Sequence, residues 1–417
     1  MPDAALRVLV VTNNYPPHTL GGYELLAADH VAWLLAEGHH VTVLTSTYGV
    51  AGRRPTEDRG AAGERVVRAL DFHWSNFRHR RPHGPCLWAG ERRQRLVVEG
   101  LVREESPSVA LTWGMAGISK SLLEVLRRAG LALPTVVGEH WPIWDIDADV
   151  WLRTWSPRAN PVLRALRAPL RGWADREVAP TDVGAAVAAM VPAYMSSTLQ
   201  REVEAGRPEW RGRGGAVPNG IRLEVFERLA PDDRPLGAPV RLLYIGRIEP
   251  RKGVHTAVEA LPLLAAAGVP AELTIVGWAG DRYAEELRAV AARLGVAKSL
   301  RWREPVHRDA VADVYAAHDV LVFPTIWSEP FGLVPLEAMA AGCLVVGTGT
   351  GGSGDHVRDG ETALRFAPED AAGLAAAVAR LVADPGLVAR LRRAGHEEAR
   401  AHDYPAYAER LRATLLL

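Results

Sequence analysis

The chain has 417 residues, of which 48% are apolar, and its 49 basic and 49 acidic residues give a formal net charge of zero. Because one hydrophobic core rarely serves more than about 300 residues, we expect two domains of roughly 200 residues each. The absence of a basic excess argues against a nucleic-acid-binding protein.

Cysteines and apolar runs suggest the compartment. Two cysteines, Cys86 and Cys343, imply no disulfide framework and fit a reducing environment. The N-terminal "LRVLVV" is too short for a signal-peptide core. No run reaches the roughly 18 apolar residues that a membrane span needs. We therefore expect a soluble, cytoplasmic protein, with peripheral membrane contact left open.

The first half alternates short apolar runs with longer amphipathic segments. Buried strands are predicted at 6–12, 41–46, 109–113, 134–140 and 184–195, and a helix at 23–40. Such alternation is typical of a parallel sheet that is covered by helices on both faces.

The second half shows the same alternation more regularly. Strands are predicted at 240–247, 271–277, 300–304, 320–325 and 343–348, and helices at 253–268, 283–295, 308–318 and 335–342. We expect an α/β protein with two doubly wound, Rossmann-like domains that face each other across a cleft.

Gly, Pro and charged residues between the two halves indicate a boundary. We predict a first, acceptor-binding domain at 1–195, a linker region at 196–239 and a second, nucleotide-sugar-binding domain at 240–395. A last helix, 396–417, is expected to cross back to the first domain.

Two glutamates, Glu329 and Glu337, flank a predicted strand-to-helix turn. Open α/β sheets bind ligands at the carboxyl ends of their strands, and a helix N-terminus attracts phosphate. Pro335 suits the first helical turn, so Glu337 is expected in that turn. Alternatively, Glu337 only complements the helix dipole and Glu329 is solvated.

Two cations, Arg247 and Lys252, follow another strand of the same predicted sheet, where they would form a diphosphate clamp. Glu249 and Arg251 of that loop are interpreted as ordinary surface residues.

Glycines occur in two further loops. "GTGTGGSG" at 347–354 contains G-x-G-x-x-G, but it neither opens a long helix nor belongs to a first βαβ unit, so we do not interpret it as a dinucleotide fingerprint. Gly351 and Gly352 are expected where backbone closely approaches a ligand. Gly21 and Gly22 either let the first loop approach an anion or form a plain turn.

These residues complete a recognisable pattern. The chain resembles the retaining glycosyltransferases of family 4, which have the GT-B fold. The resemblance spans nearly the whole chain. It is carried by "GGYE", "GHHVTVLT", "VPNGI", "YIGRIEPRKG", "LTIVG" and "EPFGLVPLEAMAAG", and more weakly by "GTGTGGSGDHVRDGETALRF".

The resemblance implies a role for each matched residue. Glu337 would bind the ribose of a nucleotide-diphosphate sugar, and Glu329 would bind hydroxyls of the donor sugar. The backbone N–H groups of Phe331, Gly332 and Leu333 would assist. Arg247 and Lys252 would hold the diphosphate, Gly21 and Gly22 would close on it, and His140 would lie near the reaction centre. The implied catalytic residues are His140, Arg247, Lys252 and Glu329.

Two positions depart from the family pattern. Glu304 stands where a glycine is common near the nucleobase, and Asp355 stands where a glutamate is usual. The first departure leaves the identity of the base open.

A tryptophan-rich segment offers a candidate acceptor site. Trp141, Trp144, Trp151 and Trp155 are dense enough to form a stacking surface for sugar rings or flat acceptors, and the alternative, given equal weight, is that half of them belong to the core.

Metal and anion sites have weaker signals. "DIDAD" at 145–149 lacks the glycine and terminal glutamate of a calcium loop, so no metal site is predicted. The basic run at 65–85 is interpreted as a solvated loop, with an anionic acceptor or membrane as the alternative.

We therefore expect a metal-independent, retaining glycosyltransferase. Its donor would be a nucleotide-diphosphate sugar, with no further cofactor, and its acceptor a small molecule such as a secondary metabolite, or a glycan. A sugar-nucleotide epimerase or hydrolase of the same fold, and a non-catalytic binding protein, stay open.

Overall fold

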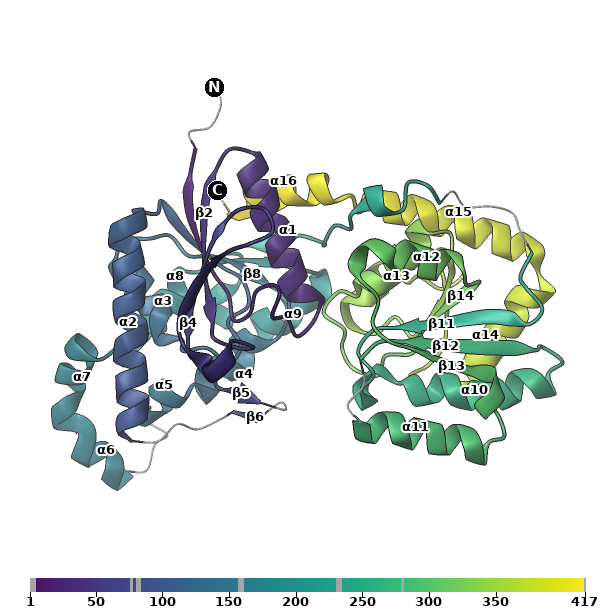
Figure 1. Cartoon of the computed structure of the whole chain (residues 1–417), viewed down its shortest axis with the longest axis horizontal. Coiled ribbons are helices and arrows are strands. Elements are labelled where there is room, and N and C mark those ends of the chain that lie inside the picture. Colours follow the sequence, from purple (N-terminus) through teal and green to yellow (C-terminus); the bar gives the residue numbers. More distant parts are fainter. Residues whose placement is uncertain are drawn as a thin grey trace. The chain divides into compact units, whose positions relative to one another are not determined.

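The structure is a computed structural model that describes residues 5–75, 78–79, 84–156, 161–229, 235–278 and 281–415 (Figure 1). The chain divides into two compact units. Unit 1 comprises Met1–Met195, Leu199–Val217 and Ala408–Leu417, and unit 2 comprises Ser196–Thr198 and Pro218–Tyr407. Part of the basic run at 65–85, namely 76–77 and 80–83, lies outside the described residues.

Unit 1 is built on an eight-stranded sheet of order β10-β9-β8-β7-β1-β2-β4-β3, parallel except for β3. Its strands are β1 (Arg7–Val11), β2 (His40–Ser46), β3 (Thr56–Arg59), β4 (Arg65–Leu70), β7 (Val109–Thr112), β8 (Pro134–Val137), β9 (Val191–Tyr194) and β10 (Gly215–Ala216). The short strands β5 (Trp74–Ser75) and β6 (Arg78–His79) pair separately.

Helices cover both faces of this sheet, with α1 on one side and α2, α3 and α8 on the other (Figure 1). The helices of unit 1 are α1 (Gly22–Ala36), α2 (Pro85–Glu105), α3 (Ser121–Arg128), α4 (Trp141–Ala148), α5 (Val150–Trp155), α6 (Pro161–Arg167), α7 (Arg171–Glu177), α8 (Gly184–Ala189) and most of α9 (Ser197–Gly206). The predicted strand at 184–195 is wrong in its first half, because residues 184–189 form α8 and only 191–194 form β9.

Unit 2 is built on a six-stranded, fully parallel sheet of order β13-β12-β11-β14-β15-β16. Its elements are β11 (Val240–Ile245), α10 (Val254–Ala266), β12 (Ala271–Val276), α11 (Asp281–Arg293), β13 (Leu300–Arg303), α12 (Val311–Ala316), β14 (Val320–Phe323), α13 (Leu333–Ala340), β15 (Leu344–Gly347), β16 (Leu364–Arg365), α14 (Ala371–Ala383) and α15 (Pro385–Ala401). Strand and helix alternate as the apolar pattern predicts.

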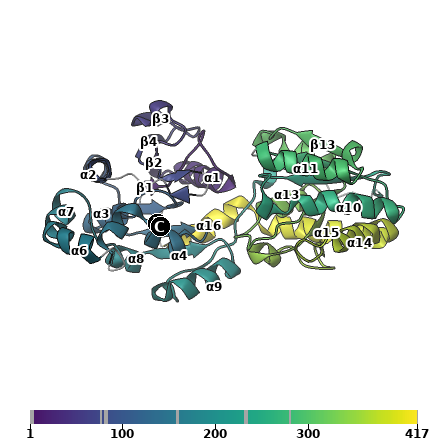
Figure 2. The ribbon, with the colours of Figure 1, turned by 90° about the horizontal axis from the view of Figure 1, so that it is seen from below.

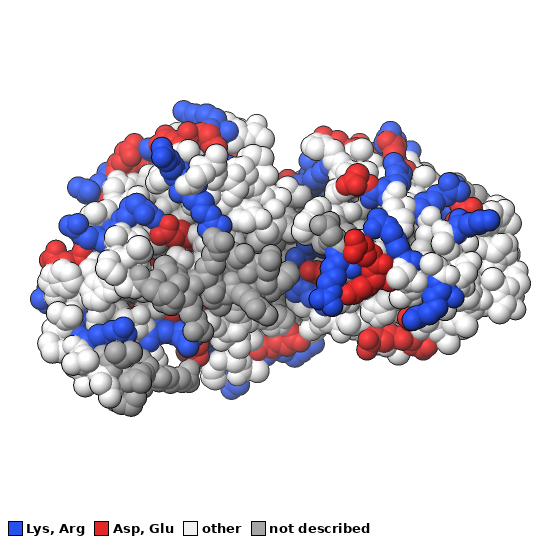
Figure 3. Space-filling view, turned by 60° about the horizontal axis from the view of Figure 1, so that its bottom comes forward, with Lys and Arg blue, Asp and Glu red and all other residues white. Residues whose placement is uncertain are grey.

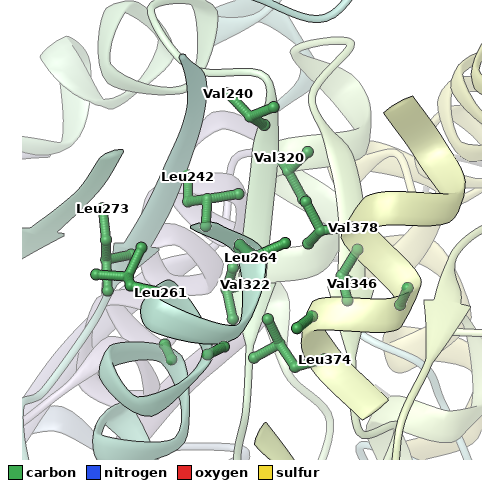
Figure 4. Packing of buried hydrophobic residues seen from close by; sticks show 14 of the residues in the cluster. Val240, Leu242, Leu261, Leu264, Leu273, Val320, Val322, Val346, Leu374 and Val378 are labelled. Atoms are coloured by element: carbon green, nitrogen blue, oxygen red, sulfur yellow. The ribbon is translucent and has the colours of Figure 1, made fainter. Parts of the chain in front are cut away.

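The core of unit 2 lies between its sheet and the helices α10 and α14. Leu261 and Leu264 of α10, and Leu374 and Val378 of α14, pack on the strand residue Val322 (Figure 4). All five are at most 4% exposed. Figure 2 shows α10, α14 and α15 of this unit from a second direction.

The order of strands in unit 2 reverses beside β11. The chain runs from β11 outward to β12 and β13, then returns to place β14 on the other side of β11. Ligands bind at such a switch point, beyond the carboxyl ends of the two strands that flank it. The loops after β11 and β14 carry the predicted cations and glutamates, so the fold brings both groups to this point.

The boundaries differ from the predicted ones. Residues 196–239 are not a separate linker, because Leu199–Val217 belongs to unit 1 and the chain from Pro218 belongs to unit 2. The return to unit 1 begins at Ala408, within α16 (Tyr404–Leu415), later than the predicted residue 396.

Among the described residues, no single helix has the length and apolar character to cross a membrane. The pair α14 and α15, bent by 105°, passes that test together, by length and composition only.

Candidate active site

The loops after β11 and β14 meet through an ion pair. Lys252 Nζ lies 2.6 Å from Glu329 Oε2, and the two side chains are 15% and 12% exposed. The indole Nε1 of Trp327 donates to the same oxygen at 2.9 Å. A cation and a carboxylate predicted from separate motifs are therefore direct neighbours in unit 2.

The remaining charged residues of the first loop join this group. Glu249 Oε1 lies 2.7 Å from Arg251 Nε and 3.5 Å from Arg247 Nη2. The Arg251 guanidinium lies over the Trp327 ring, 4.2 Å from its centroid. The interpretation of Glu249 and Arg251 as ordinary surface residues is thus wrong, because both help to fix the two loops.

Glu337 lies in the second turn of α13, not in the first as predicted, because the helix begins at Leu333. Tyr315 of α12 donates its hydroxyl to Glu337 Oε2 at 2.8 Å. Burial raises the pKa of the Glu337 carboxyl, while the Tyr315 hydrogen bond and the charge of Arg308 oppose that rise. Complementing the helix dipole is therefore not its role.

A pocket opens beside Glu337. Its walls include Leu333 of α13, Arg308, Phe226 and Ile221, all from unit 2. A half-buried carboxylate on an apolar and cationic wall can accept hydrogen bonds from the hydroxyls of a bound molecule.

The glycine-rich segment supports the Glu329 loop from behind. It forms the short helix η8 (Gly351–Asp355), and the Gly352 N–H donates to the Glu329 carbonyl at 2.6 Å. A Cβ on Gly351 would lie 2.4 Å from that carbonyl oxygen. The close backbone approach predicted for Gly351 and Gly352 therefore occurs, but to the chain's own loop.

The start of α13 has the geometry of a backbone donor site. Gly332 is the N-cap, with φ of 82°, and the following Leu333 opens the helix. Phe331 is 2% exposed and packs against the rings of His356 and His402, which fixes the turn. Burial lowers the pKa of His356 to about 3, so that ring packs as a neutral group.

The predicted residues of unit 1 follow two strands, Gly21 and Gly22 at the start of α1 after the β1 loop and His140 in the loop after β8. Gly21 is the N-cap of α1, and its N–H already donates to Glu24 Oε2 at 2.9 Å. His140, after β8, has its Nε2 2.6 Å from Glu202 Oε2 of α9. Glu24 and Glu202 were not singled out from the sequence. The roles of Gly21, Gly22 and His140 remain predictions.

The prediction of a tryptophan stacking surface is largely wrong. Trp141 and Trp151 are 0% exposed and Trp155 is 5% exposed. Trp151 Nε1 donates to the Pro180 carbonyl at 2.7 Å, and its ring packs edge-on against Trp155. These rings are core, so only Trp144, which is half-buried, keeps an accessible surface.

The aspartates of "DIDAD" have structural partners. Asp145 forms a fully buried ion pair with Lys120. Asp149 caps α5 by accepting from Leu152 N at 2.9 Å, and its other oxygen accepts from Lys120 N at 2.8 Å. Across the described ranges, no group of three or more His, Cys, Asp or Glu side chains could hold a metal ion.

Charges are mixed across both units. On the face shown in Figure 3, basic and acidic side chains lie interspersed, in keeping with the zero net charge.

Two sheets of mainly parallel strands, with cations and carboxylates at the switch point of unit 2, are the arrangement of an α/β protein that binds a nucleotide. The family model of glycosyl transferases group 1 matches residues 239–384, which covers most of unit 2. The glycogen synthase of Mycobacterium tuberculosis is 40% identical over 422 residues, covering 94% of this chain and 90% of that protein. The chain therefore belongs to the group 1 glycosyltransferases, of the family 4 type.

Further similarities agree with this assignment. The D-inositol 3-phosphate glycosyltransferase of Acidothermus cellulolyticus is 39% identical over 190 residues, which cover 42% of this chain and 41% of that protein. Sucrose-phosphate synthase from Thermosynechococcus elongatus has a TM-score of 0.68 at 20% identity, covering 97% of this chain and 96% of that one. The lipopolysaccharide glycosyltransferase WaaG has a TM-score of 0.65 at 18% identity, covering 98% and 99%. The fold is GT-B, as predicted.

Proposed function

We propose that the chain is a retaining glycosyltransferase. It moves glucose from a nucleotide-diphosphate-glucose donor to a hydroxyl of a glucan or of a small-molecule acceptor. The observation that carries the proposal is the Lys252–Glu329 ion pair at the switch point of unit 2. Glu337, which lines the pocket of the same unit, accompanies it. Cations suit a diphosphate, and carboxylates suit sugar hydroxyls, so the group has the chemistry of a nucleotide-sugar site.

Each side chain has a part in this proposal. Glu337 accepts hydrogen bonds from the ribose, and the ammonium of Lys252 and the guanidinium of Arg247 hold the diphosphate. Glu329 uses Oε2 for Lys252 and Trp327, which leaves Oε1 to accept a hydroxyl of the donor sugar. The N-terminus of α13, at Gly332, adds backbone donors and the positive end of a helix dipole.

The chemistry follows from where charge develops. As the glycosidic bond to phosphate breaks, negative charge grows on the leaving diphosphate, and fixed positive groups stabilise that charge most in the transition state. Arg247 and Lys252 supply the positive charge, so the proposal includes neither a metal ion nor a further cofactor. Activity in excess chelator should persist. Loss of turnover that magnesium or manganese restores would contradict this part.

Names of related proteins guide the choice of substrates. The relative that aligns over 94% of the chain is a glycogen synthase, and one solved neighbour, HepE of Anabaena, was crystallised with UDP and glucose. Other relatives act on D-inositol 3-phosphate. We therefore place a glucosyl donor first, with a glucan and a small phosphorylated polyol as the acceptors to compare.

The direct test pairs UDP-, ADP-, GDP- and dTDP-glucose with malto-oligosaccharides and with D-inositol 3-phosphate. The proposal expects an acceptor-dependent release of nucleoside diphosphate and a glucosylated product. Release at the same rate without acceptor would favour a hydrolase instead. No turnover of any donor, together with tight nucleotide binding, would favour a binding protein.

Retention is tested on the same product. Glu329 and Glu337 are assigned to the donor, so neither of these two carboxylates serves as the base of an inverting attack or as the nucleophile of a double displacement, and His140 is the candidate base for the inverting alternative. The proposed route is attack on the same face as the leaving phosphate, so an α-linked donor should give an α-linked product. Proton NMR of the anomeric coupling distinguishes the outcomes, and a β-linked product would contradict retention.

A further inference from the structure

Five of the large apolar side chains that are exposed in the described part of the chain belong to unit 1, and four of them lie in one segment. Val162, Leu166, Leu170 and Trp173 are 67%, 68%, 48% and 49% exposed, and Leu96 of α2 is 45% exposed. Scattered exposed apolar residues are ordinary, but a contiguous group marks an interaction surface.

Four of these residues form one stripe. They belong to α6, the 3-10 turn η2 (Ala168–Leu170) and α7, which follow one another directly from 161 to 177. Val162 and Leu166, four residues apart, share one face of α6, and Leu170 and Trp173 follow in η2 and α7, beyond the break at Pro169. Ala174 is buried on α7, as is Val178 just beyond its end, whereas Val162, Leu166 and Leu170 face solvent. Trp173 lies at the edge of the stripe, with half of its surface exposed and its ring stacked on Trp88.

The segment is firmly attached, so its exposed side is a built surface. Arg95 of α2 donates to the carbonyls of Arg176 and Glu177 at 2.7 and 3.1 Å. Asp175 accepts from Arg128 at 2.9 Å, and the Trp173 ring stacks on Trp88 at a centroid distance of 5.9 Å. Figures 1 and 2 both show α6 and α7 together at one edge of unit 1.

Positive charge accompanies the stripe. Residues 161–174 hold three arginines and no acidic residue, and the acids that follow include Asp175, whose carboxylate is paired with Arg128. Arg171 is exposed beside Leu170. An apolar face of Leu and Trp bordered by arginines is the pattern of a helix that lies in a membrane interface.

We propose that the α6–η2–α7 segment is a docking surface for a membrane whose lipids carry negative charge. The apolar stripe enters the boundary between headgroups and acyl chains, and Arg167 and Arg171 pair with anionic headgroups. A second copy of the chain fits less well, because a two-fold contact through this surface would bring the same arginines face to face. The inference does not depend on the proposed donor chemistry.

The test uses the full chain and co-sedimentation with vesicles. We expect binding to vesicles of equal parts phosphatidylglycerol and phosphatidylcholine, little binding to phosphatidylcholine alone, and weakening with added salt, since each arginine near an anionic surface contributes roughly a fivefold factor. Equal binding to both vesicles, or none to either, would overturn the proposal.

A matched pair of double variants locates the surface. Leu166→Ser with Leu170→Ser should weaken vesicle binding by roughly tenfold or more, because burying a leucine is worth about 1.5–3 kcal/mol. Leu263→Ser with Val382→Ser changes two residues of unit 2 that are 41% and 42% exposed, and should leave binding unchanged. Thermal melting and turnover with soluble substrates check that both variants fold.

Two results would contradict the assignment. Equal loss of vesicle binding in both double variants would show that the stripe is not the docking surface. A concentration-dependent dimer, seen by sedimentation velocity and abolished only by the Leu166 and Leu170 changes, would assign the stripe to a second copy instead.

Discussion

The hydrogen-bonded pair of Glu337 and Tyr315 predicts how mutations change the affinity for a nucleoside diphosphate. The hydroxyl of Tyr315 holds Glu337 Oε2 at 2.8 Å and so orients the carboxylate beside the pocket. Glu337→Ala should weaken binding of a nucleoside diphosphate by roughly ten- to a hundredfold, since a charged hydrogen bond is worth about 1.5–3 kcal/mol. Tyr315→Phe keeps the carboxylate but frees its orientation, so it should weaken binding less. Calorimetry measures both, and an unchanged affinity in Glu337→Ala would contradict the ribose assignment.

Lys252 is the residue whose loss should lower the turnover number. Its ammonium has three donors, of which one reaches Glu329. Lys252→Ala should lower kcat by roughly a hundredfold while KM changes less, because charge on the leaving group peaks in the transition state.

Lys298 provides the control for that measurement. It is an exposed lysine of unit 2 in the turn η6 (Ala297–Ser299). Lys298→Ala should leave both kinetic constants as they are. If Lys252→Ala raised only KM, the lysine would bind the ground state and the transition state equally, and its catalytic role would be withdrawn.

At the scale of elements, η8 supports the Glu329 loop through glycines. Gly351 has φ of 60°, and a Cβ there would lie 2.4 Å from Glu329 O and 2.5 Å from Glu329 N. Gly351→Ala should therefore displace the loop and cut turnover strongly. Gly360→Ala is matched, because its φ of 70° gives the same strain of about 1 kcal/mol, but nothing lies within 4 Å of the added Cβ. Equal activity in the two variants would show that the loop position does not matter.

Helix α2 carries a buried carboxyl that should make unit 1 sensitive to pH. Glu91 Oε2 accepts from Ser119 and Ser121, at 2.8 Å each. Burial, with the nearby charge of Asp149, raises its pKa from 4.5 to about 8. Between these values the folded state keeps a proton that the unfolded state has lost, so the folded state loses stability as pH rises from 4.5 to about 8.

Glu91→Gln removes that dependence while still accepting from the two serines. Its melting temperature should exceed that of the wild type at pH 8, by an amount that corresponds to roughly 4 kcal/mol, because each pKa unit is worth about 1.4 kcal/mol, and the difference should nearly vanish at about pH 4. Thermal melts across pH give the comparison. A variant that is destabilised equally at both values would show that the carboxyl is ionised throughout.

For the molecule as a whole, the sequence predicts the parallel sheets well because buried strands and covering helices have different apolar periods. It also predicts that Lys252 and Glu329 lie together, since the carboxyl ends of parallel strands share one edge. It misses Tyr315, which meets Glu337 only through the packing of α12 on α13. The tryptophans of 141–155 mislead because aromatic density does not distinguish core from surface. Only tertiary packing shows that Trp141 is fully buried.

The division into two units predicts which part of the chain a bound nucleotide stabilises. The groups proposed for the donor's nucleotide, Arg247, Lys252 and Glu337, all belong to unit 2. A ligand that binds only the folded state stabilises it by about 2.7 kcal/mol at 100 times its dissociation constant. UDP, ADP or GDP should therefore raise the melting transition of unit 2 more than that of unit 1, which scanning calorimetry and hydrogen exchange resolve by unit. The base that gives the largest shift identifies the donor, and Lys252→Ala should reduce that shift. Protection of unit 1 alone would move the donor site to the other sheet and contradict every residue assignment made for it.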